Sequence, residues 1–407
     1  MKKLFWLTGV VCWFFLSPAG VQGQVQSITT FTSIARLEKT IDSLAGNPSK
    51  ERGEFLLHEL YERLRDSHLI PFRLADSVLF IYYGAAESVS WAGDFNGWDP
   101  DAKSFSGRSS GSGNLWIMKQ QFPADARLDY KIVINHKNWI LDPGNNHHQE
   151  SGFGGNSELC MPEYVVPWET VYDSTVSQGS LSGNILLESR LLGYDMNYCV
   201  YLPKNYERLT GLPVVYVLDG HEYADAQKGA MVQVLDNLIG KGIIRPVIAV
   251  FIDPREPGNP ANNRRMKEYT GNPRFVKCIC QELVPHIDSV YRTDGVPGSR
   301  MILGTSLGGW AAAFFGAQSP GVFGLIAIHS PAFDKEIIRQ YAESPLLPLR
   351  IYMSTGVMHD TEARARDMRE VLIKKGYPLK YTEVNQGHSW GNWKGLIDEP
   401  LEWFFAK

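Results

Sequence analysis

The sequence predicts an α/β protein in which a small all-β, immunoglobulin-like sandwich precedes a doubly wound, mostly parallel sheet. Two observations predict this order. Between residues 76 and 162, short segments alternate apolar and polar residues with period two, whereas after residue 165 continuous apolar runs alternate with helical patterns. The 407 residues also exceed what one hydrophobic core usually serves, so we expect more than one domain.

The first 23 residues have the pattern of a signal peptide. Lys2 and Lys3 precede an apolar run over residues 4–16, and small residues end at Gly23. We therefore expect residues 1–23 to be removed and the protein to be exported, to the periplasm or the medium. The apolar run is short for a bilayer crossing and no later run of about 18 apolar residues occurs, so no membrane span is expected.

The apolar pattern of residues 24–75 predicts a helical lead-in, a short helical segment that precedes the sandwich. Two sets of apolar residues recur at intervals of three and four, which is the spacing of one helix face. The sets are Ile34, Leu37, Ile41 and Leu44, and then Leu57, Leu60 and Leu64.

Residues 76–162 predict the sandwich. Four segments have the alternation of strands, and turn-rich segments at 94–100 and 108–114 separate them. The strand candidates are residues 77–83, 89–92, 115–118 and 128–134. Several short strands at this spacing favour two packed sheets.

Residues 163–407 predict the parallel sheet. Antiparallel strands are expected first, around Val171, at 185–192 and at 197–202. Continuous apolar runs divided by helices follow, which is the pattern of a sheet covered on both faces. The runs are 214–218, 247–252, 301–303, 325–328 and 350–353, with a final strand at 381–384, and the helices include 275–291, 307–318 and 361–374.

Composition excludes some functions. A formal net charge of −4 and a pI of about 6.2 provide no basic field for a phosphate backbone, so no nucleic-acid partner is expected. The cysteines after residue 23 could be buried thiols or form a disulfide, but they lack the spacing of a zinc site. They are Cys160, Cys199, Cys278 and Cys280. No metal and no organic cofactor is expected.

The sharpest local feature is the segment GTSLGG at residues 304–309, which lies between a predicted strand and a predicted helix. A serine hydroxyl is a weak nucleophile, so it must be held at a tight turn where a base can reach it. Ser306 occupies that position, and Gly304 and Gly308 allow the close approach. The alternative is that Ser306 is an ordinary helix N-cap.

Two later residues would complete a Ser-His-Asp triad. Asp360 follows one late strand and His388 follows the last, and the carboxyl ends of parallel strands meet at one edge of a sheet. His388 would accept the serine proton, and Asp360 would orient the imidazole. Glu362, Asp334 and His359 remain alternative partners, and Asp360 could instead cap a helix.

The oxyanion hole needs two backbone N–H donors. Leu307, directly after the nucleophile, would supply the first. Gly220 or His221, in the loop after the strand at 214–218, would supply the second. A plain strand-to-helix turn is the alternative for this loop.

Together these motifs resemble the enterochelin-esterase-like, or esterase-D-like, branch of the α/β-hydrolases. The resemblance covers about residues 165–407 and is carried by the segments at 219–220, 304–309, 356–360 and 387–393. It implies an α/β-hydrolase fold and a serine esterase without a cofactor. The branch includes siderophore, feruloyl and acetylxylan esterases, so the substrate class stays open among these.

The segments WAGDFNGW at 91–98 and WILDP at 139–143 resemble an early-set, glycogen-binding type of sandwich that often precedes such esterases. This resemblance covers about residues 76–162 and implies a carbohydrate-binding-like domain. Its tryptophans would suit stacking on a sugar, although aromatics in a small sandwich also form its core. They are Trp91, Trp98 and Trp139.

The substrate contacts are expected in a polar segment at 253–269 and beside the histidine. Arg264 and Arg265 could grip a planar oxyanion with two bonds, or belong to a solvated loop paired with Glu268. Trp390 could line the pocket or pack the last helices. We expect the partner to be a small-molecule or polysaccharide-linked ester. The alternatives are a glycan-binding protein with an inactive hydrolase scaffold, and an acyltransferase that uses the same triad.

Overall fold

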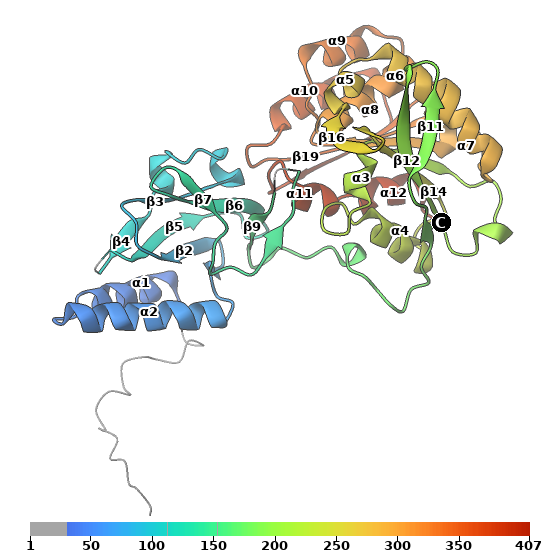
Figure 1. Cartoon of the computed structure of the whole chain (residues 1–407). Helices are drawn as coiled ribbons and strands as arrows, with labels where there is room; N and C mark the ends of the chain where they lie inside the picture. The colour runs from blue at the N-terminus through green and yellow to red at the C-terminus, as the bar shows by residue number, and fades with distance from the viewer. Residues whose placement is uncertain (1–30, 112, 153) are drawn as a thin grey trace, which may run out of the picture.

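Residues 31–111, 113–152 and 154–407 are described by the computed structural model, and the expected signal peptide, 1–23, lies outside them. A helical pair and a β-sandwich occupy one side of the molecule, and a large sheet flanked by helices occupies the other (Figure 1). The predicted fold class is confirmed, with the all-β region preceding the α/β region.

The lead-in forms two helices, α1 (Ile34–Ala45) and α2 (Lys50–Asp66). Each begins at a serine whose Oγ accepts a hydrogen bond from the backbone N–H three residues later, at 3.1 and 3.3 Å. These bonds satisfy donors that a helix start otherwise leaves free. Both predicted apolar faces are buried against the first sheet of the sandwich.

Nine short strands form the two sheets of the sandwich. One sheet has the order β1-β2-β5-β4, and the other has the order β3-β6-β9-β8 with β7 paired to β6. The bounds are β1 Phe72–Leu74, β2 Ser77–Tyr83, β3 Val89–Gly93, β4 Arg108–Ser110, β5 Leu115–Gln121, β6 Arg127–Ile134, β7 Asn138–Ile140, β8 His148–Gln149 and β9 Asn156–Cys160.

Strand β2 is buried on both faces. Val78 and Phe80 face the second sheet, whereas Leu79 and Ile81 face the helices α1 and α2. A strand covered on both sides carries apolar residues at every position, which explains the continuous run in its sequence.

The large sheet has the order β10-β12-β14-β13-β17-β18-β19-β20, with β11 also paired to β12. Strand β12 is antiparallel to β14, and every pair from β14 to β20 is parallel. The bounds are β10 Ser180–Leu181, β11 Ile185–Ser189, β12 Tyr194–Leu202, β13 Val214–Val217, β14 Ile248–Asp253, β17 Arg300–Thr305, β18 Leu325–His329, β19 Arg350–Gly356 and β20 Leu379–Val384; β15 Arg255–Glu256 and β16 Asn259–Asn263 form a separate hairpin.

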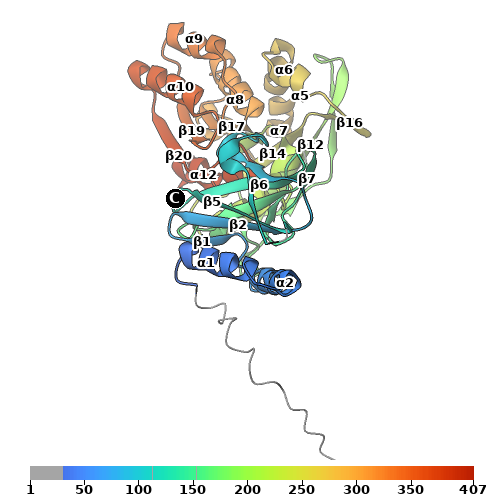
Figure 2. The ribbon, with the colours of Figure 1, turned by 90° about the vertical axis from the view of Figure 1, so that its left-hand side faces the viewer.

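Helices cover both faces of this sheet (Figure 1), and Figure 2 views the molecule from the side of the sandwich. The core on one face includes α6 to α10, and the core on the other includes α4, α11 and α12. The bounds are α3 Gly220–Tyr223, α4 Met231–Gly240, α5 Arg265–Tyr269, α6 Pro273–Cys278, α7 Val284–Val290, α8 Leu307–Gln318, α9 Lys335–Glu343, α10 Glu362–Lys375, α11 Trp390–Lys394 and α12 Asp398–Phe405.

Two details differ from the sequence prediction. The strand expected around Val171 is wrong: Val171 is exposed and follows a 3-10 turn, and its carbonyl accepts a hydrogen bond from Asn237 Nδ2 at 2.8 Å instead of from a strand. The helix expected over 275–291 is interrupted by a π-helical turn at Ile279–Leu283. The turn precedes Pro285, which has no N–H for a regular helical bond.

The cysteines at 160, 199, 278 and 280 are free thiols. Within the described ranges, no helix is both long and apolar enough to cross a bilayer.

Candidate active site

Ser306 lies at the tight turn between β17 and α8. Its backbone has φ 57° and ψ −119°, a strained conformation that is concentrated at functional positions. A Cβ on Gly304 would lie 2.2 Å from the carbonyl oxygen of Gly308, so only glycine fits there. Although Ser306 directly precedes the helix, its side chain makes no capping hydrogen bond.

The side chain of Ser306 instead faces His388. Ser306 Oγ lies 2.9 Å from His388 Nε2, and His388 Nδ1 lies 2.6 Å from Asp360 Oδ1. The three residues follow β17, β20 and β19, so they meet at the carboxyl edge of the sheet. The Asp360 side chain is fully buried and that of His388 is 35% exposed, so the site opens to solvent at the histidine.

Three donors hold the second oxygen of Asp360. Its Oδ2 accepts from the Gly356 N–H at 2.6 Å, from Ser330 Oγ at 2.5 Å and from Thr355 Oγ1 at 3.3 Å. These bonds fix the carboxylate and leave Oδ1 for His388. Sequence reasoning missed these donors, and the only signal for them was their position at the ends of neighbouring strands.

The alternative acidic partners lie elsewhere. Asp334 caps α9, where its Oδ1 accepts from the Ile337 N–H at 2.9 Å. Glu362 is the first residue of α10, and the N-cap of that helix is Thr361 rather than Asp360. The carboxylate facing the imidazole is therefore that of Asp360.

The expected oxyanion donors begin two helices. Leu307 is the first residue of α8, and Gly220 and His221 are the first two of α3. N–H groups at these positions have no acceptor within their own helix. A Cβ on Gly220 would lie 2.3 Å from the carbonyl carbon of Phe251, so the loop is packed tightly on β14.

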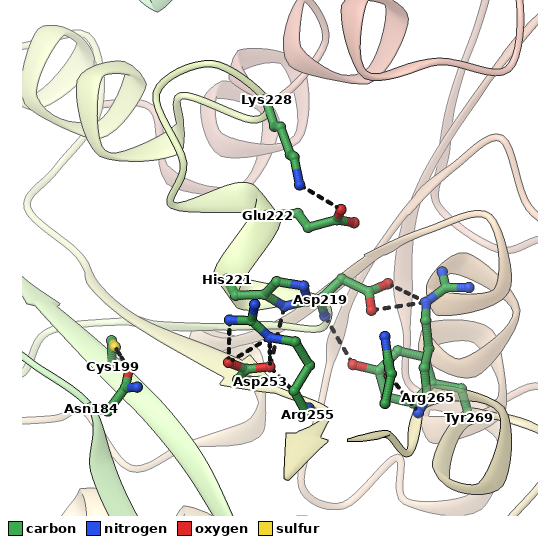
Figure 3. Close-up of polar contacts among 11 residues, drawn as sticks. Asn184, Cys199, Asp219, His221, Glu222, Lys228, Asp253, Arg255, Arg265 and Tyr269 are labelled. Atoms are coloured by element: carbon green, nitrogen blue, oxygen red, sulfur yellow. Dashed lines mark hydrogen bonds and ion pairs between the residues drawn. The ribbon is translucent and has the colours of Figure 1, made fainter. Parts of the chain in front are cut away.

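Arg265 connects this loop to the end of β17, and Figure 3 shows its contact with Asp219. Its Nε lies 2.8 and 2.9 Å from the two carboxylate oxygens of Asp219, and its Nη2 donates to the carbonyl of Thr305 at 3.3 Å. The Asp219 N–H also donates to the Tyr269 hydroxyl at 2.9 Å. Burial raises the pKa of Asp219 to about 6, against the opposing effect of Arg265.

The other two predicted substrate contacts are also engaged. Arg264 lies over the Tyr194 ring at 4.2 Å and pairs with Glu256 at 2.9 Å. Trp390 is only 2% exposed and packs edge-on against Tyr223 at 5.0 Å, so it belongs to the core and offers little surface to a ligand.

Four charged side chains lie in or beside the loop that carries Gly220 and His221 (Figure 3). His221 Nδ1 lies 3.3 Å from Asp253 Oδ1, and Arg255 pairs with the same carboxylate at 2.7 Å. Burial lowers the pKa of His221, against the opposing effect of Asp253. Glu222 pairs with Lys228 at 2.9 Å.

The tryptophans of the sandwich divide into core and surface. Trp91 is fully buried and lies 5.9 Å from the Phe80 ring, so it belongs to the core. Trp98 and Trp139 stack with centroids 6.5 Å apart and planes at 23°, and Trp139 is 42% exposed. Of these three tryptophans, the stacked Trp98 and Trp139 present an aromatic surface to solvent, and Trp91 does not.

The Esterase family model matches residues 189–404, just over half of the chain, and this range contains Ser306, Asp360 and His388. The chain belongs to the Esterase family. It is accordingly a carboxylic ester hydrolase.

Curated relatives of this esterase differ in how much of this chain, and of their own length, the similarity covers. The uncharacterized protein YjcH of Bacillus subtilis (strain 168) is 27% identical over 53% of this chain and 93% of that protein. An endo-1,4-beta-xylanase/feruloyl esterase of Xylanibacter ruminicola is 26% identical over 72% of this chain and 40% of that protein. The iron(III) enterobactin esterase of Dickeya dadantii is 22% identical over 48% of each chain. The esterase thus spans less than half of the last two relatives.

The fold is shared with a solved esterase. The enterobactin esterase FES of Shigella flexneri superimposes with a TM-score of 0.67 at 18% identity, over 81% of this chain and 92% of that chain. The matched part is longer than residues 163–407, so the shared fold extends beyond the large sheet.

Within the described residues, no group of three or more His, Cys, Asp or Glu side chains is arranged to hold a metal ion.

Proposed function

We propose that this esterase is an exported serine esterase that works through an acyl-enzyme on Ser306. The observation that carries the proposal is the chain of contacts from Ser306 Oγ to His388 Nε2 at 2.9 Å and from His388 Nδ1 to Asp360 at 2.6 Å. A hydroxyl, a base and a group that orients the base are the parts that nucleophilic catalysis needs.

The reaction follows from these positions. His388 Nε2 accepts the hydroxyl proton as Ser306 Oγ attacks the ester carbonyl, and Asp360 stabilises the positive imidazole. The N–H of Leu307, together with that of Gly220 or His221, stabilises the oxyanion. The tetrahedral intermediate expels the alcohol, which takes the proton from His388. Water, activated by the same histidine, then releases the acid and restores the serine.

We assign the substrate to the feruloyl or acetyl esters of carbohydrates, with siderophore esters as the second class. Support comes from the named activities of the relatives, feruloyl esterase and enterobactin esterase. The exposed Trp98–Trp139 stack on the sandwich favours a carbohydrate-linked ester, because such a surface suits a ring-shaped group. Release assays on feruloylated arabinoxylan, acetylated xylan and a catecholate trilactone compare the classes directly.

The triad is tested with Ser306→Ala. The variant should fold normally by circular dichroism and lose hydrolysis of p-nitrophenyl acetate, and a fluorophosphonate probe should label the wild type alone. Unchanged hydrolysis by the variant would refute the proposal, and an unlabelled, inactive wild type would favour a glycan-binding scaffold. Product analysis with added acceptor alcohols separates hydrolysis from acyl transfer.

Export is tested separately. Expression of the full chain in a bacterial host should give a mature protein outside the cytoplasm that starts near Gln24. Amino-terminal sequencing that finds the intact leader on a cytoplasmic protein would contradict it.

A further inference from the structure

Arg127 is the first residue of β6, in the sandwich, yet its side chain points to the large sheet's active-site edge. Its side chain is fully buried. It pairs with Asp129 Oδ1 at 2.7 Å through Nη1 and with Glu158 Oε1 at 2.6 Å through Nε. Burial alone would lower the pKa of Arg127, but Asp129 and Glu158 raise it, so the guanidinium stays charged.

The same arginine bonds the loop that carries His388. Arg127 Nη1 donates to Ser389 Oγ at 3.1 Å, and the Arg127 backbone N–H donates to the carbonyl of Asn385 at 3.2 Å. Asn385 Nδ2 in turn donates to Asp125 Oδ1 at 2.8 Å. His388 therefore lies between two points at which the sandwich holds its loop.

The hydroxyl of Ser389 has an unusual hydrogen-bond partner for its position in the chain. It is the N-cap of α11, where a serine hydroxyl ordinarily accepts from its own helix. Here the side chain makes no capping bond and accepts from Arg127 instead. The loop thus uses its serine for the contact with the sandwich.

Two glycines allow the backbone of the loop to lie directly on the sandwich. A Cβ on Gly391 would lie 1.8 Å from Arg127 Cζ, and a Cβ on Gly387 would lie 2.1 Å from Asp94 Cγ. Asp94 is itself tied to β6, because its Oδ2 accepts from the Asp129 N–H at 2.8 Å. A side chain at either position would have to displace Arg127 or Asp94.

The topology explains why the loop needs this support. Strand β20 is the last strand of the large sheet, so one of its edges has no strand beside it. Just beyond β20, Arg127 forms a parallel β-bridge with Gln386. The backbone of the sandwich therefore contacts the chain just after it leaves β20, where it turns into the His388 loop.

We propose that Arg127 is a positioning residue for the esterase reaction, which makes the sandwich part of the catalytic unit. It holds residues 385–391 so that His388 Nε2 stays within hydrogen-bond reach of Ser306. This inference rests on the proposed role of Ser306 and His388. Arg127 acts through the loop, so it governs the rate of proton transfer and has no part in binding a small substrate.

Ser389→Ala is the cleanest test, because it removes the Arg127 contact and leaves the buried charges of the sandwich paired. We expect kcat for p-nitrophenyl acetate to fall about tenfold with KM unchanged, a change typical of a misplaced base. The rate of fluorophosphonate labelling of Ser306 should fall by the same factor. Ser389→Thr, which keeps the hydroxyl, should restore most of both rates.

Arg127→Gln should lower kcat at least as much, and the double variant should be no slower than Arg127→Gln alone, because both changes remove one contact. Arg366→Gln is the matched control. It breaks an exposed ion pair with Glu383 of β20, at 2.8 Å, and should leave kcat unchanged.

The outcomes separate the two proposals. If Ser389→Ala keeps the wild-type kcat and labelling rate while Ser306→Ala is inactive, the positioning role is wrong and the serine mechanism stands. A lower melting temperature with unchanged kcat would mean that the contact is merely structural, which also overturns it. Wild-type turnover by Ser306→Ala would overturn both proposals. If Arg127→Gln does not fold, Ser389→Ala and Ser389→Thr decide alone.

Discussion

The Arg265–Asp219 pair and the Arg127–Asp129 pair are alike in chemistry and differ in what they join. Arg265 connects two loops of the large sheet beside the expected oxyanion donors, and its side chain is 26% exposed. Arg127 connects the sandwich to the loop of His388 and is fully buried with Asp129. One pair organises a single region, and the other fixes two regions against each other.

Because the two pairs differ in burial, we expect them to contribute differently to stability. An arginine near the surface can be replaced by water, and its aspartate can take up a proton. A fully buried arginine leaves charges that no solvent reaches when it is lost. The two pairs should therefore respond differently to the same substitution and to pH.

The largest expected effect is that of Arg127→Met on stability. The variant leaves Asp129 and Glu158 without their cation, so the free energy of unfolding should fall by about 3–5 kcal/mol, the usual result of breaking a buried ion pair. Urea denaturation followed by tryptophan fluorescence measures it. A loss below about 1 kcal/mol would mean that the pair behaves as a surface pair.

Arg265→Gln should lower the free energy of unfolding by less, about 1–3 kcal/mol at pH 8, because one buried carboxylate loses a hydrogen-bond donor. The pKa of Asp219 is already raised to about 6, and removal of Arg265 raises it further. At pH 5 the carboxyl is largely protonated with or without the arginine, so the loss should shrink there. Equal losses at both pH values in urea titrations would contradict this.

Asp94→Asn should change how stability depends on pH. Burial, and then the charge of Asp129, raise the pKa of Asp94 from 3.8 to about 8. Unfolding releases this proton between those values, so Asp94 makes the folded state less stable as pH rises through that window. The variant should remove this contribution. Melting temperatures of both proteins from pH 5 to pH 8 measure it, and parallel curves would contradict the shifted pKa.

The smallest effect is expected for the exposed Arg366–Glu383 pair, which has the bidentate geometry but lies at the surface of β20. Arg366→Gln should change the free energy of unfolding least of all, because an exposed ion pair gains little over its two solvated side chains. The value should shrink further in 1 M salt, which screens exposed charges. A loss comparable to that of Arg127→Met would show that pairing, rather than burial, governs the comparison.

Much of the fold was predictable because the pattern of apolar residues follows directly from which faces are covered. The helix at 307–318 and the strand at 325–328 were placed within one residue of α8 and β18. The strand expected around Val171 is absent because this apolar segment is an exposed connection. Its composition resembles that of a strand, but composition does not show whether a segment is buried.

The candidate site was predictable as far as its local turns. Ser306, Asp360 and His388 each follow a strand, and their order along the chain predicts that the three side chains meet, as they do. Contacts between residues distant in the sequence were not predictable in this way, as Arg265 shows. As a sequence feature it suggested a substrate contact, but in the folded chain it binds Asp219 from 46 residues away.

The periodicity of each element and the sharp turns before Ser306, Asp360 and His388 can be read from the sequence, because they depend on neighbouring residues. The contact of Arg127 with Ser389, 262 residues further along, and the backbone bridge of Arg127 to Gln386 depend on how the sandwich packs on the large sheet. The physical reason is that such contacts come from the packing of two separately patterned regions, and a local pattern does not encode which surface a buried charge will meet.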